Sequence, residues 1–88
     1  MKGTLTVLNI KVLGAGCANC KRLEAETRAA LDGAGIPYDL VKVTEYADIM
    51  AYGVMSTPAL VINEKVVSSG RIPARSQIVK LANETESA

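Results

Sequence analysis

The spacing of hydrophobic residues predicts a strand that leads directly into a helix. From Thr4 to Leu13 both alternating faces are largely apolar, which is typical of a strand covered on both sides in an α/β sheet. From Cys17 to about Ala34 apolar residues recur at steps of three and four, which predicts an amphipathic helix. Glycines near its end and Pro37 beyond it stop the helix.

The next stretch predicts a second strand and a short second helix. Tyr38–Val43 completes a strand, helix and strand unit, in which the two strands run parallel. We expect Thr44 to cap the second helix and Gly53 to end it. Its inward-facing residues are predicted to be Tyr46, Ile49 and Met50.

The last third of the chain predicts a hairpin followed by a helix. A third strand over Thr57–Ile62 opens on a proline, and Asn63-Glu64 forms a tight turn into an antiparallel strand from Lys65 to Ser68. A final helix follows Pro73. The predicted order is therefore βαβαββα in one α/β domain over residues 1–83, with residues 84–88 as a frayed polar tail.

Composition and charge exclude several classes of function. A net charge of +1, with neither sign gathered into a run, argues against nucleic acid or an anionic membrane as the partner. No stretch predicts a membrane span or an export signal, so we expect a cytoplasmic protein. The absence of histidine excludes Ser-His-Asp and Cys-His catalysis.

The two cysteines of the chain lie where the first strand gives way to the first helix. Cys17 and Cys20 are three residues apart in the first helical turn, close enough to form a disulfide. A helix N-terminus stabilises a thiolate, and Lys21 and Arg22 add positive charge nearby. These positions predict that Cys17 attacks a disulfide and that the more buried Cys20 resolves the mixed disulfide.

Other interpretations of the cysteines stay open from the residues alone. They could be two small apolar core thiols, or a CxxC motif that binds Cu(I) or Zn in a metal-chaperone-like module. Pro58 could likewise be a trans proline that opens a strand, or a cis proline that faces the cysteine loop.

Taken together, the CxxC motif at the first helix, Thr57-Pro58 at the third strand and the βαβαββα order resemble the thioredoxin fold. The chain is most similar to small thioredoxin-like redox-active disulfide proteins. The resemblance implies a four-stranded mixed sheet with helices on both faces and a site that needs no cofactor besides the Cys17–Cys20 disulfide, and no metal. It further implies a cis Pro58 packed on that disulfide, with the supporting residues Thr57, Gly16, Ala18, Asn19 and Lys21.

The resemblance also implies partners. We expect a protein disulfide as substrate, an upstream reductase or glutathione as electron source, and a monomer that binds neither nucleic acid nor membrane. For glutathione the candidate cations are Lys11, Lys21 and Arg71. Gly16 and Ala18-Asn19 depart from the aromatic residue and Gly-Pro of thioredoxin's own motif, so the direction of exchange stays open. Thioredoxin's buried acid is also absent; Lys11, on the same strand, could stabilise the thiolate or simply extend to solvent.

Overall fold

The computed structural model describes residues 7–87 and places seven elements in the predicted order. The elements are β1 (Leu8–Leu13), α1 (Ala18–Ala34), β2 (Tyr38–Val43), α2 (Tyr46–Ala51), β3 (Ala59–Ile62), β4 (Lys65–Ser69) and α3 (Arg75–Ser87). The βαβαββα prediction is confirmed.

The four strands form one mixed sheet in the order β2-β1-β3-β4. β1 pairs in parallel with β2 and antiparallel with β3, and β4 pairs antiparallel with β3. β1 is therefore central, as its apolar faces predicted. The β3–β4 turn has left-handed backbone angles at Asn63 and Glu64, with φ of 51° and 68°, which confirms the predicted tight turn.

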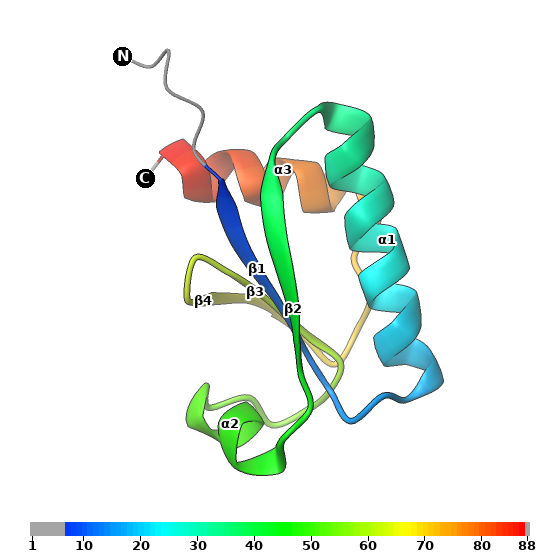
Figure 1. Cartoon of the computed structure of the whole chain (residues 1–88), viewed down its shortest axis with the longest axis vertical. Coiled ribbons are helices and arrows are strands. Elements are labelled where there is room, and N and C mark those ends of the chain that lie inside the picture. Colours follow the sequence, from blue (N-terminus) through cyan, green and yellow to red (C-terminus); the bar gives the residue numbers. More distant parts are fainter. Residues whose placement is uncertain (1–6, 88) are drawn as a thin grey trace.

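The larger core lies between one face of the sheet and two helices, α1 and α3 (Figure 1). Leu8, Ile10 and Val12 alternate along β1, so all three point to this face, where they are buried. Their partners are buried apolar residues of α1 and α3, which include Leu23, Leu31, Ile78 and Ala82. This core holds the start of α1, and with it the cysteines, at the end of β1.

The smaller core lies on the opposite face, where α2 covers only the end of the sheet at which β1 and β2 finish (Figure 1). Ile49 of α2 packs there with Leu13 and Val61. Helices thus cover both faces, as the resemblance implied. Because α2 covers so little of the sheet, Ile49 is its buried residue, while Tyr46 and Met50 are 74% and 48% exposed. The predicted inward orientation of Tyr46 and Met50 was wrong.

Several predicted boundaries also differ from the structure. The third strand begins at Ala59 and not at Thr57. Glu45, not Thr44, is the residue that precedes α2, and its side chain makes no capping hydrogen bond. Helix α3 continues to Ser87, through most of the segment expected to be a frayed tail, because no glycine or proline follows Pro73 to end it. Residues 4–6 of the predicted first strand and residue 88 of the predicted tail lie outside the described residues.

Candidate active site

The two cysteines form a disulfide at the N-terminus of α1. Cys17 is the N-cap residue in an extended conformation, and its Cα lies 5.0 Å from that of Cys20. The backbone amide of Cys20 donates a hydrogen bond to the sulfur of Cys17 over 3.2 Å, and the carbonyl of Cys17 accepts the first helical bond from Lys21. The sulfur of Cys17 therefore satisfies one of the amides that a helix leaves unpaired at this end.

The two sulfurs differ in access. Cys17 is exposed, whereas only 5% of Cys20 is exposed. The interpretation as two buried core thiols is therefore wrong. An incoming group can reach Cys17, while Cys20 is held behind it in the first turn of the helix.

Two glycines shape the loop before the disulfide in different ways. A Cβ on Gly14 would collide with the sulfur of Cys20, so the backbone at this position lies directly against the disulfide. A Cβ on Gly16 would meet open space, but the φ of +87° at this position is one that residues other than glycine rarely adopt. Glycine is therefore favoured here by the backbone angle and not by lack of room. The other predicted loop residues, Ala18, Asn19 and Lys21, are all exposed around the disulfide.

The segment before β3 meets the disulfide from the other side of the site. The Thr57–Pro58 peptide bond is cis, so the cis alternative for Pro58 is the one observed. Thr57 Cβ lies 3.9 Å from the position of a Cβ on Gly14, next to Cys20, and Pro58 is buried. The carbonyl of Pro58 accepts a hydrogen bond from Gly70, which ties this segment to the end of β4. The structure thus brings Thr57 to the cysteines from forty residues away in the chain.

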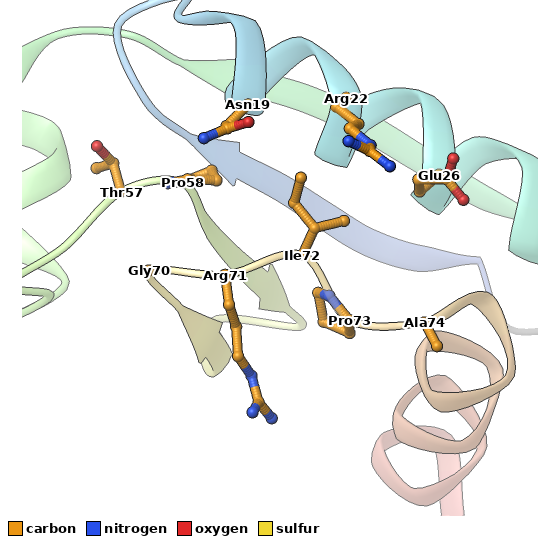
Figure 2. Close-up of a pocket in the computed structure, with 10 residues that line it drawn as sticks. All are labelled: Asn19, Arg22, Glu26, Thr57, Pro58, Gly70, Arg71, Ile72, Pro73 and Ala74. Carbon is orange, nitrogen blue, oxygen red and sulfur yellow. The ribbon is translucent and has the colours of Figure 1, made fainter.

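An open groove of about 470 Å³ begins at this junction and follows α1. Figure 2 shows Asn19, Arg22 and Glu26 along the helical wall, Thr57 and Pro58 at one end, and the segment 70–74 as the opposite wall, with Ile72 pointing toward α1. The sequence did not predict this groove, because its walls come from segments some fifty residues apart.

A second, smaller cavity of about 80 Å³ reaches Cys20 from the β2 side. Gly14, Lys21 and Lys42 are among the residues that line it. Lys21 therefore lies on a different side of Cys20 from the groove.

Lys11 lies in the middle of β1, on the face of the sheet that α2 covers only at one end. Its ammonium group donates to the hydroxyl of Tyr52 and to a carboxylate oxygen of Glu64, both over 2.7 Å. The hydrogen bond from Lys11 lowers the pKa of Glu64, and the hydrogen bond to Glu64 raises the pKa of Lys11. Lys11 is thus held by the β3–β4 turn and lines neither cavity at the disulfide, so the alternative in which Lys11 stabilises the thiolate has no support.

The three cations considered for glutathione are not brought to one place. Arg71 lines the groove, Lys21 lines the smaller cavity, and Lys11 is bonded to Glu64. These three candidates therefore do not form a single cationic site for glutathione.

Within residues 7–87, no group of three or more His, Cys, Asp or Glu side chains could hold a metal ion. No helix in the same range is long and apolar enough to cross a bilayer.

Comparisons with known proteins place these features in a family. Residues 8–83 match a family model described as a thioredoxin domain. A thioredoxin of Methanothermobacter thermautotrophicus is 31% identical over 75 residues, which cover 85% of this chain and 97% of that protein. A thioredoxin of Methanocaldococcus jannaschii is 30% identical over 69 residues, 78% of this chain and 79% of that protein.

A solved structure agrees on the fold. Chlamydomonas reinhardtii thioredoxin f2 superposes with a TM-score of 0.59 at 12% identity, over 99% of this chain and 86% of that one. With the Cys17–Cys20 disulfide, the family match and the relatives make the protein a thiol–disulfide oxidoreductase. The chain belongs to the thioredoxin domain family.

Proposed function

We propose that the protein exchanges its Cys17–Cys20 dithiol with disulfides of other proteins, and that the two cysteines have separate roles. The observation that carries this proposal is the difference in access, because Cys17 is exposed while Cys20 is only 5% exposed behind it. A substrate sulfur can therefore approach Cys17 and not Cys20.

The first step forms a mixed disulfide. In the reduced protein the Cys17 thiolate attacks one sulfur of the substrate disulfide, and the other substrate sulfur leaves as a thiolate that takes up a proton. The amide of Cys20, which donates to the Cys17 sulfur in the disulfide state, is placed to stabilise the thiolate by the same hydrogen bond.

The second step releases the substrate. Cys20 loses its proton and attacks the Cys17 sulfur, the mixed disulfide breaks, and the remaining substrate sulfur leaves as a thiolate. The protein ends as the Cys17–Cys20 disulfide and the substrate as a dithiol, so two electrons have passed to the substrate. The same steps in reverse oxidise a dithiol.

Substrate binding rests on the backbone of Thr57. Thr57 lies outside the β ladder, is exposed, and makes no backbone hydrogen bond to another described residue. An extended substrate segment can pair with this free backbone while its cysteine meets Cys17, which adds a short strand beside the site. The cis Pro58 and the exposed loop residues Gly16, Ala18, Asn19 and Lys21 support this segment.

The remaining partners follow from the electron balance. Each turnover leaves a disulfide, so a reductase or glutathione must return two electrons when the protein acts as a reductant. We place the protein in the cytoplasm as a monomer that needs no metal or further cofactor.

Reduction of insulin by the protein, with dithiothreitol as electron source, tests the proposal. We expect turnover by the natural chain and none by the Cys17→Ser variant. A Cu(I) titration of the reduced protein tests the rival class. Tight one-to-one Cu(I) binding without insulin reduction would show that the CxxC motif is a metal carrier instead.

A further inference from the structure

The described residues that line the groove beside the disulfide carry more positive than negative charge, two arginines against one glutamate. Arg22 on α1 and Arg71 on the opposite rim line it, and neither makes an ion pair with another described residue. Figure 2 shows the Arg22 side chain in the space between α1 and the 70–74 segment, while Arg71 extends from the rim away from α1.

The single carboxylate in the groove lining, Glu26, does not cancel these charges. Arg75 donates a hydrogen bond to Glu26 over 2.6 Å, which lowers the pKa of that carboxyl and keeps it ionised. Arg22 also lowers the pKa of Glu26 through its charge, but more weakly than Arg75, which holds this carboxylate by the hydrogen bond. One carboxylate is thus shared between two arginines. The lining that remains is cationic, in a protein whose net charge is only +1.

The length of the groove fits a short stretch of extended chain. Its helical wall runs from Asn19 to Glu26, which are seven residues and about 10 Å apart along a helix. An extended chain rises about 3.3 Å per residue, so about three residues span this wall. Arg22 lies one turn beyond Asn19, so it meets the residues nearest to a cysteine bound at Cys17.

We propose that this groove selects protein disulfides whose reactive cysteine has an acidic residue within about three positions, bound by Arg22 and, at the rim, by Arg71. The inference rests on the proposed function, because it names the substrate class of the same site. Guanidinium groups suit carboxylates because they can donate two parallel hydrogen bonds. Acidic residues of the substrate thus supply the counter-charge that the groove lacks.

The test compares disulfide-linked peptides that differ only in one residue beside the cysteine, which is Glu, Gln or Lys. We expect kcat/KM to fall in the order Glu, Gln, Lys, by about 2- to 5-fold per step at low salt, as for exposed ion pairs. The differences should shrink at high salt, which screens such pairs.

Substitutions test whether the groove residues cause this preference for acidic peptides. Arg22→Gln should reduce the ratio of the Glu to the Gln peptide by about 2- to 5-fold, and Arg22→Glu should favour the Lys peptide. Lys80→Gln is the matched control, because it removes one exposed positive charge on α3 outside the groove lining. It should leave the ratio unchanged.

Three outcomes would overturn the proposal. Equal rates for the three peptides would show that the groove does not read charge, and an equal loss in Lys80→Gln would show an effect of net charge alone. The third outcome is that the protein turns over oxidised glutathione faster than the Glu peptide and that Arg22→Gln abolishes this advantage. The groove would then bind glutathione and not an acidic protein segment. The natural protein is also tested with hydroxyethyl disulfide, which is neutral. If it exchanges with this compound, the proposed function holds and only the charge preference has failed.

Discussion

The backbone of Gly14 lies directly against the sulfur of Cys20, with no room for a Cβ between them. Gly14→Ala should therefore force the disulfide or the end of β1 to move, at a cost of about 1 to 3 kcal/mol of the free energy of unfolding. The disulfide fixes the Cys20 side chain, so we expect a larger loss in the oxidised protein. Thermal unfolding of both redox forms measures this difference.

Gly33→Ala is the matched control for this change. Gly33 lies within α1, and a Cβ there meets nothing within 4 Å. The same added methyl group should stabilise the helix by about 0.5 to 1 kcal/mol. If both variants shift the unfolding temperature in the same direction, the close approach of Gly14 to Cys20 is not what constrains this position.

The unequal exposure of the cysteines predicts which one traps a substrate. Cys20→Ser removes the resolving thiol, so the variant should accumulate a mixed disulfide through Cys17 when mixed with oxidised insulin. Cys17→Ser leaves only the buried thiol and should trap at least about 10-fold less. Non-reducing electrophoresis and peptide mass mapping check both results. Equal trapping by the two variants would contradict the assigned roles.

Lys11 should contribute to stability and not to disulfide exchange. Its ammonium group is bonded to Tyr52 and Glu64 and is absent from both cavity linings. We expect Lys11→Met to lower the unfolding temperature slightly while the rate of exchange with hydroxyethyl disulfide stays within about 2-fold. A 10-fold slower exchange, with the fold intact, would instead identify Lys11 as a stabiliser of the thiolate.

The pH dependence of stability should show the two lowered carboxyl pKa values. The hydrogen bonds from Lys11 and Arg75 hold the pKa values of Glu64 and Glu26 below their ordinary value of about 4.3. Each group therefore contributes stability above that pH, and loses it as the pH falls through its lower folded-state pKa. The doubly substituted variant Glu26→Gln, Glu64→Gln should lose less of its unfolding temperature on acidification. If the unfolding temperature of this variant falls as steeply with decreasing pH as that of the natural protein, these hydrogen bonds contribute nothing to stability.

Much of the fold follows from local sequence patterns. The alternation of Leu8, Ile10 and Val12 predicts a buried central strand, and the run from Cys17 to Ala34 predicts α1 almost to the residue. Asn63-Glu64 predicts the turn, because Asn is one of the few residues besides Gly that tolerate left-handed angles. In these segments the local preference and the final packing agree.

The misplaced features depend on contacts that no local pattern encodes. The orientation of Tyr46 and Met50 is set by how little of the sheet α2 covers. The bond between Lys11 and Glu64 joins residues 53 positions apart, so the strand pattern around Lys11 carries no sign of its partner. The groove has the same origin, because its walls meet only in the folded chain.

The site itself was predicted in part. The CxxC motif at a strand-to-helix junction indicated Cys17 and Cys20, and the resemblance supplied Thr57 and Pro58. Arg22 was predicted only as nearby positive charge, and its position opposite the 70–74 segment was not predicted. A helical repeat that places Asn19, Arg22 and Glu26 on one face was the only available signal.

An equilibrium redox titration of the Cys17–Cys20 pair tests the central claim most directly. The protein would be held in dithiothreitol or glutathione buffers of stepped potential, and its free thiols alkylated and counted by mass. We predict a reversible two-electron transition between disulfide and dithiol at a potential between about −270 and −120 mV, the range of known CxxC oxidoreductases. A pair that stays in one state across this range, or that reacts only by joining two chains, would contradict dithiol exchange as the function of this site.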